Sequence, residues 1–188
     1  MQNSEWANLN YMNPTELLLG MDEMLDASGI KKYKNASDIL LNRRTRDLAE
    51  DRRCAIFCHG AGQALGTDIL FAPYDEPEFD YVGAYKYGNN VMTFPIEMKQ
   101  LAPDRFKPLT CLQTQISKLR KYADTRLVVA IHINRMIHIK PQELDVTGVR
   151  VKEIWLYGQL QNDAANWLLC GNLMSGNPKA YTFQLPAT

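Results

Sequence analysis

The segment from residue 89 to residue 101, NNVMTFPIEMKQL, alternates apolar and polar side chains with a period of two. This alternation predicts a half-buried β-strand, because successive side chains of a strand point to opposite faces of the sheet. We expect the buried face to carry Met92, Phe94, Ile96 and Met98. The opposite face then carries Val91, Thr93, Pro95, Glu97 and Lys99.

The preceding segment EFDYVGAYKYG also reads as a strand, and KYGNN suggests a tight hairpin between the two. A turn at residues 88–89 places Asp80 directly opposite Glu97, whereas a turn at residues 89–90 places it opposite Lys99. In both registers the three residues share one face, since directly opposed residues of a ladder do so. Within the later strand, a proline that cannot donate a ladder hydrogen bond predicts a bulge or an unpaired side.

Helical spacing and caps predict a helix over residues 13–29, and a helical pattern returns from residue 37 to residue 65 as two helices or one kinked helix. A further helix is expected over 109–123. The other strand candidates are 67–73, 126–134, 149–160, 166–173 and 180–185. This order predicts an α+β or α/β fold, with a mixed central sheet flanked by helices. We expect a single domain overall, composed of an N-terminal helical extension (1–35) and a core (36–188).

Composition narrows the classes of partner. The 188 residues carry 21 Lys and Arg against 21 Asp and Glu, so a globally basic nucleic-acid binder is excluded while a local basic groove is not. The apolar runs are too short to span a bilayer, and we expect a cytoplasmic protein with no membrane partner. Cys54 and Cys58, beside His59, faintly suggest a metal site; free thiols packed as small hydrophobes are the plainer interpretation of all four cysteines.

Two carboxylates opposite each other on a sheet repel unless a positive charge lies between them. A divalent cation provides that charge, and Mg²⁺ favours carboxylate oxygens while leaving positions open for phosphate. A lysine one pleat further along can stabilise the charge that develops on a phosphoryl oxygen. The pattern Asp80, Glu97, Lys99 therefore indicates phosphodiester hydrolysis.

Asp80, a hairpin, and then Glu97-Met98-Lys99, preceded by a helix and followed by a helix and a strand, resemble the PD-(D/E)XK nuclease superfamily. The resemblance covers roughly residues 46–134. It implies a restriction-endonuclease-like three-layer core. It also implies that Asp80 and Glu97 bind a catalytic Mg²⁺ or Mn²⁺, helped by the backbone carbonyl of Met98, and that Lys99 is the motif lysine.

Many members of the superfamily add a catalytic acid from the preceding helix. Glu50 matches best, because it extends the apolar stripe of that helix by one turn, and Asp51 is second. The exonuclease branch also carries a glutamine and a tyrosine on the next helix, for which Gln115 and Tyr122 are the candidates. In the motif the residue before the aspartate is proline, whereas in this chain it is Phe79.

The sequence thus predicts a Mg²⁺-dependent deoxyribonuclease whose DNA contacts lie in a groove lined by Lys and Arg; a homodimer would suit cleavage of both strands. The arginine-rich stretch 43–53 and Lys118, Arg120 and Lys121 either contact phosphates or form solvated helix faces.

Three alternatives compete with this reading. The fold could serve as a non-catalytic DNA- or protein-binding module, or the chain could be an unrelated α+β domain whose Glu97 and Lys99 point into water. Glu50, for its part, could simply pair with Arg46 or Arg53 along the helix.

Overall fold

The computed structural model describes residues 5–27, 46–101, 111–135, 137–160 and 166–187. Seven strands form one sheet whose spatial order follows the chain. The strands are β1 (Ile69–Glu76), β2 (Phe79–Tyr87), β3 (Asn90–Leu101), β4 (Val128–Ile133), β5 (Glu153–Gln159), β6 (Asn166–Gly171) and β7 (Lys179–Gln184). The helices are α1 (Pro14–Ala27), α3 (Arg46–Leu65) and α4 (Leu112–Lys118), with short 3-10 turns η1 (Trp6–Asn8), η4 (Leu119–Lys121), η5 (Pro141–Glu143) and η6 (Leu173–Ser175).

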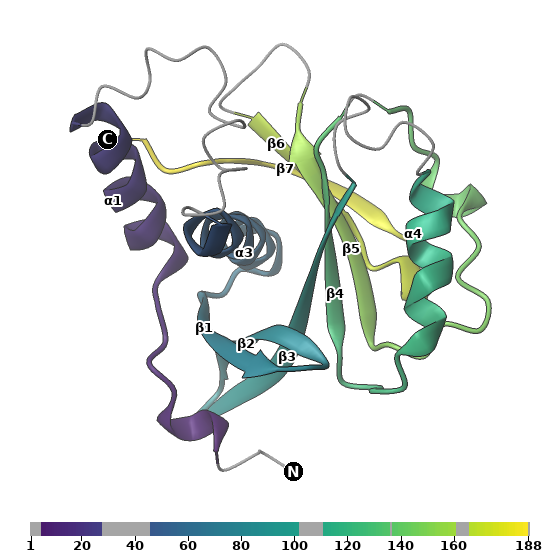
Figure 1. Ribbon diagram of the computed structural model, residues 1–188, viewed down its shortest axis with the longest axis horizontal. Coiled ribbons are helices and arrows are strands. Elements are labelled where there is room, and N and C mark those ends of the chain that lie inside the picture. The colour runs from purple at the N-terminus through teal and green to yellow at the C-terminus, as the bar shows by residue number, and fades with distance from the viewer. Residues whose placement is uncertain (1–4, 28–45, 102–110, 136, 161–165, 188) are drawn as a thin grey trace.

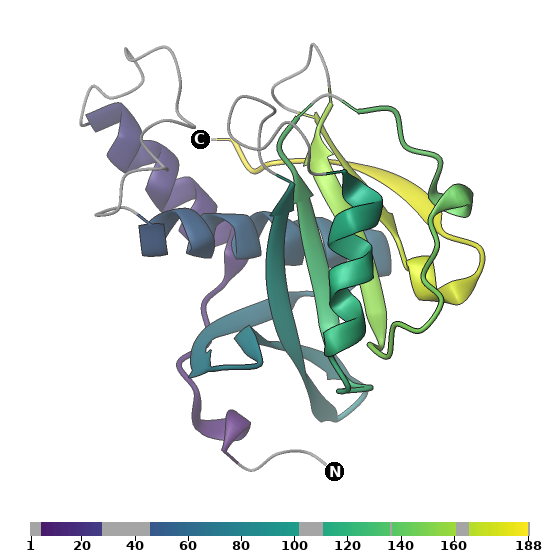
Figure 2. The same cartoon turned by 45° about the vertical axis from the view of Figure 1, so that its right-hand side comes forward.

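The sheet is mixed and lies between two helical layers. β3 pairs with β4, and β4 with β5, in parallel, while the other neighbours are antiparallel. α1 and α3 cover one face, and α4 with η4 covers the other (Figures 1 and 2). This confirms the general expectation of an α+β fold with a mixed sheet flanked by helices.

The helix ends follow the local sequence signals. The Asn13 side chain accepts a hydrogen bond from the Thr15 backbone N–H at 2.9 Å, as expected of a cap for α1. Gly66, just after α3, has a φ of 67° and ends that helix in the left-handed region. The expected stop at Gly29 and the expected helical residues 37–45 lie outside the described residues. None of the described helices is both long and apolar enough to cross a membrane.

The hairpin between β2 and β3 has the register that a turn at residues 88–89 predicts. Every pair of the ladder, ending at Tyr81 and Ile96, fits this turn without a shift. Gly88 adopts a φ of 58°, which is easy for a residue without a Cβ atom. The alternative turn at residues 89–90 is therefore wrong.

Extending this register by one residue brings Asp80 opposite Glu97, with Lys99 on the same face. Pro95 pairs with Val82 without a bulge. The expectation of a bulge at this proline is therefore wrong, and the other expectation, an unpaired side of the strand, is correct. In an antiparallel hairpin the pair next to a two-residue turn is hydrogen-bonded, and hydrogen-bonded and non-hydrogen-bonded pairs then alternate along the ladder. By this count Pro95 and Val82 form a non-hydrogen-bonded pair, so the nitrogen of Pro95 points away from β2. On that side β4 has not yet begun.

Burial along β3 differs from the simple alternation. Pairing with β4 begins only at Ile96, so the hairpin tip protrudes and Met92, expected in the core, is 43% exposed. Conversely, Glu97 is only 6% exposed, because Tyr122 beyond η4 lies over it. The interpretation of Glu97 as a solvent-facing residue is wrong.

The N-terminal segment packs closely on the sheet. Trp6 of η1 is buried against Phe79, and Arg126 lies over its ring with 5.5 Å between the guanidinium carbon and the ring centre. Met12 then pairs with Phe71 through two backbone hydrogen bonds of 2.7 and 3.2 Å. The segment thus covers part of the exposed edge of β1 before α1 begins.

All four cysteines are free thiols. Cys54 and Cys58 are buried one turn apart in α3 with their sulfur atoms 4.0 Å apart, and Cys170 is buried as well, so the packing interpretation is confirmed for these three. Cys111 departs from it: this thiol is exposed and caps α4 by accepting the Thr114 backbone N–H at 3.3 Å.

Two helical glycines should respond oppositely to alanine. A Cβ atom on Gly60 of α3 would lie 2.6 Å from the Phe183 ring of β7, whereas one on Gly20 of α1 would meet nothing within 4 Å. We expect Gly60→Ala to lower the free energy of unfolding by about 1–3 kcal/mol through overpacking. Gly20→Ala should raise it by about 0.5–1 kcal/mol through helix propensity. Urea denaturation measures both; shifts of the same sign would contradict the packing described here.

Candidate functional site

The site lies where β2 and β3 separate. The ladder between them ends at Tyr81 and Ile96, and the next N–H of β3 that faces β2 belongs to Met98. The Asp80 carboxylate accepts this N–H at 2.8 Å and so replaces the missing strand partner. The carbonyl of Met98 points to the same side as its N–H, since a strand residue directs both groups to one neighbour. Asp80 and the Met98 backbone therefore face each other across the gap.

Glu97 is the buried acid of the site. Its side chain is 8% exposed, and one of its oxygens, Oε1, contacts the Lys99 ammonium. The same oxygen accepts a hydrogen bond of 2.6 Å from the hydroxyl of Tyr122. A buried carboxylate needs such partners, because an uncompensated buried charge is strongly unfavourable.

The pKa values of Asp80 and Tyr122 are both shifted in the folded protein. The pKa of Asp80 is raised, mainly because the surrounding strands remove part of the water around its carboxylate, although this residue still reaches solvent. The negative charges of Glu97 and Glu50 raise it further. The Met98 N–H and the Lys99 charge oppose this rise. The pKa of Tyr122 is raised well above its usual value by burial and then by its hydrogen bond to Glu97, so the hydroxyl stays protonated and acts as a donor.

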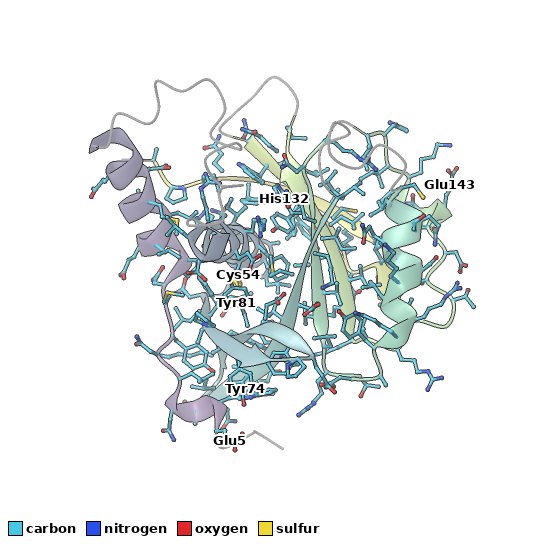
Figure 3. The ribbon with its side chains drawn as sticks, in the orientation of Figure 1. Glu5, Cys54, Tyr74, Tyr81, His132 and Glu143 are labelled. Carbon is cyan, nitrogen blue, oxygen red and sulfur yellow. The ribbon has the colours of Figure 1, made fainter. Side chains whose placement is uncertain are left out.

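The two acids of α3 approach the site from the other face of the sheet. Glu50 lies 3.5 Å from Arg53, which is the helical ion pair that the sequence offered as an alternative, yet its charge still reaches Asp80. Asp51 accepts a hydrogen bond of 2.9 Å from the hydroxyl of Tyr81, which points from β2 toward α3 (Figure 3). Glu50 is thus near the site but not beside Glu97, and Asp51 has a partner of its own.

The donor set suits one kind of cation. Asp80 Oδ1 and Glu97 Oε2 have no hydrogen-bond partner among the described residues, Asp80 borders the gap toward which the Met98 carbonyl points, and the charge of Glu97 acts on Asp80. Within the described part of the chain, no group of three or more His, Cys, Asp or Glu side chains could enclose a metal ion. Mg²⁺ needs no such cage, since one or two carboxylates with water and substrate oxygens commonly hold it. The residues therefore fit Mg²⁺ or Mn²⁺ better than Zn²⁺.

Of the glutamine and tyrosine candidates on the helix after the hairpin, the structure brings only Tyr122 to the acids. Gln115 is half-buried in α4, and its backbone N–H bonds to the carbonyl of Cys111 within the first turn. The position of Tyr122 depends on the end of η4, where its N–H bonds to the Leu119 carbonyl at 3.0 Å. Phe79, the residue before Asp80, packs among the buried apolar residues on the face of the sheet that α4 covers.

A polar cavity of about 320 Å³ lies between the start of α1 and the end of α3. There His59 lies 3.0 Å from the Thr15 hydroxyl and 3.0 Å from the Gln184 carbonyl. Sequence reasoning missed this contact, because the three residues are far apart in the chain. His132 is a packing residue: burial lowers its pKa to about 3, and its ring stacks on that of Tyr157.

Comparisons of this chain with protein-family models, with curated proteins and with solved structures found no match.

Proposed function

We propose that this protein is a metal-dependent nuclease that hydrolyses DNA phosphodiester bonds at Asp80, Glu97 and Lys99. The observation that carries the proposal is the gathering of three charges where β2 and β3 separate: the register continued by one residue brings Asp80 opposite Glu97, the charges of Glu97 and Lys99 act on Asp80, and Lys99 contacts Glu97. Two acids close together repel and do not by themselves stabilise a fold, and such arrangements cluster at functional sites. The order α3, β1, β2, β3, α4, β4, with β3 and β4 parallel, also supports a restriction-endonuclease-like core.

Each residue has a distinct part in hydrolysis. Asp80, Glu97 and the Met98 carbonyl are the groups that would hold a divalent cation, which supplies Lewis-acid polarisation of the phosphate when bound. Lys99, with 32% of its side chain exposed, orients the attacking water and stabilises the negative charge that develops on the phosphoryl oxygens. Water forms the new bond to phosphorus while the bond to the leaving oxygen breaks. Glu50 assists through its charge near Asp80.

Tyr122 is a positioning residue, because its hydroxyl holds Glu97 and need not touch the substrate. We expect Tyr122→Phe to lower the free energy of unfolding by about 1.5–3 kcal/mol, as for other hydrogen bonds to charged groups. It should also raise the Mg²⁺ concentration for half-maximal cleavage about tenfold or more, since outer partners of metal ligands have effects of this size. Thermal melting and a Mg²⁺ titration of the cleavage rate measure the two effects.

Tyr74→Phe is the matched control for this substitution. Tyr74 stacks on Phe79 with 5.2 Å between ring centres, and its hydroxyl has no hydrogen-bond partner among the described residues. This control should change neither quantity. A Tyr122→Phe protein with an unchanged Mg²⁺ requirement would remove Tyr122 from the account of the site.

A non-catalytic DNA- or protein-binding module is the second candidate. The observation that favours it is that Glu97 already has two partners, Lys99 and Tyr122, and is therefore compensated without a cation. In that case the acids are a structural remnant, and the chain binds its partner without cutting it.

Cleavage assays separate the two candidates. The purified protein is incubated with supercoiled plasmid and with linear DNA, in Mg²⁺, in Mn²⁺ and in chelator. The nuclease proposal predicts products that depend on the metal and disappear in Glu97→Gln. Intact DNA under all conditions would refute the proposal and favour the binding module. The product form distinguishes nicking of the plasmid from digestion that starts at ends.

A further inference from the structure

We propose that Lys121 forms a second phosphate subsite, which binds a backbone phosphate next to the one that is cut. The inference rests on the proposed function and deepens it, because it names the side from which the strand enters the same site. The ligand is a nucleic-acid phosphodiester, recognised by charge and not by base.

The position of Lys121 is tied to the buried acid by an aromatic ring. Its ammonium lies 4.8 Å from the ring centre of Tyr122, and the hydroxyl of that tyrosine is bonded to Glu97. The Lys99 ammonium lies 6.0 Å from the same ring centre. Two ammonium groups thus lie within 6.0 Å of one ring centre, and a strand whose cleaved phosphate lies at Lys99 passes close to Lys121.

The cations on either side of Lys121 have their charges compensated. Arg120 lies 3.2 Å from the Asp145 carboxylate, and Arg126 lies 3.2 Å from the Asp124 carboxylate. Lys121 is exposed, and no carboxylate of the described residues lies within ion-pair distance of it. An uncompensated ammonium, held in place by a cation–π contact, is available to an incoming phosphate.

A DNA strand could instead follow the arginines of α3, but these arginines offer less free positive charge to phosphate. Arg53 is paired with Glu50 at 3.5 Å. Arg52 is half-buried, and this burial lowers the pKa of its guanidinium. The charges therefore favour a strand that crosses the ring of Tyr122 toward η4 over one that follows α3.

A contact to phosphate alone strengthens binding of substrate and transition state equally, so its loss acts on KM and not on kcat. We expect Lys121→Ala to raise KM for a fluorescently labelled DNA about five- to tenfold with kcat unchanged within about twofold. The slope of log KM against log salt should fall by about 0.7–0.9, the value for one released phosphate contact. Lys121→Arg should retain the wild-type slope.

Lys118→Ala is the matched control, because Lys118 is an exposed lysine of the same helical segment and the described cation–π contacts to the Tyr122 ring come from Lys99 and Lys121. It should behave as the wild type. A Lys121→Ala protein that matches Lys118→Ala in both KM and salt slope would overturn the subsite while leaving the nuclease intact.

A wild-type protein that cuts nothing would refute the proposed function separately. The same labelled DNA is then titrated in Ca²⁺ at several salt concentrations. A smaller salt slope for Lys121→Ala than for Lys118→Ala would still support the phosphate subsite, as part of a binding surface. Equal slopes, or no binding by the wild type, would refute the subsite as well.

Discussion

Lys99→Ala is expected to lower kcat for DNA cleavage by about 10²–10³-fold, the usual effect of removing one donor that stabilises transition-state charge. The ammonium of Lys99 is the only described cation that contacts the buried carboxylate of Glu97. Its loss should also destabilise the fold by about 1–3 kcal/mol, because Glu97 keeps a single partner, the Tyr122 hydroxyl. Single-turnover cleavage and thermal melting measure the two effects.

A divalent cation should restore the stability that Lys99→Ala loses, but not the lost cleavage rate. Mn²⁺ replaces the missing positive charge beside Glu97, so it should raise the melting temperature of Lys99→Ala more than that of the wild type. Lys86→Ala, which removes an exposed lysine near the hairpin tip, is the control and should leave rate and stability unchanged. Full activity in Lys99→Ala would exclude this lysine from the chemistry.

Asp80→Asn is expected to abolish cleavage and yet to raise the melting temperature in chelator. The pKa of Asp80 is raised in the folded protein, so its ionised form is less favourable there than in the unfolded chain. The native state is therefore favoured while Asp80 is protonated, and this advantage is lost as the pH rises through the folded pKa. Asparagine carries no charge at any pH, and its amide oxygen can still accept the Met98 N–H.

The pH dependence checks the sign of this effect. The gain of Asp80→Asn over the wild type should be present at neutral pH and should shrink as the pH falls toward the unfolded pKa, about 3.9. At the same Mn²⁺ concentration, Mn²⁺ should stabilise the variant less than the wild type. Asp68→Asn, an exposed acid outside the site, is the control. If the wild type were more stable than Asp80→Asn in chelator at neutral pH, the ionised form of Asp80 would not be unfavourable in the folded protein, and the prediction would be contradicted.

Local signals allowed much of the fold to be predicted. The alternation along β3 and the glycine near the turn predicted the hairpin with two possible registers, both of which placed Asp80, Glu97 and Lys99 on one face, and the structure selects the turn at residues 88–89. The strand expected over residues 126–134 is β4, and its first four residues are all buried, as suits a continuous apolar run. These features depend on residues that are neighbours in the chain or across one tight turn.

Features that depend on distant contacts were not predictable. Met92 fits the apolar alternation, but its exposure depends on where β4 begins to pair. The burial of Glu97 depends on Tyr122, 25 residues later in the chain. The proximity of Glu50 to Asp80 likewise follows from the way α3 crosses the sheet. A residue-by-residue pattern contains no information on such packing.

The most direct test of the site is a calorimetric titration of Mn²⁺ into the wild type, Asp80→Asn, Glu97→Gln and the double variant. If both acids hold one cation, the wild type binds one Mn²⁺ per chain and each single substitution weakens binding about tenfold or more. The double variant should then be little worse than the weaker single variant, because the two losses are coupled. A wild type that binds no Mn²⁺, or single variants that bind as tightly as the wild type, would contradict the metal site.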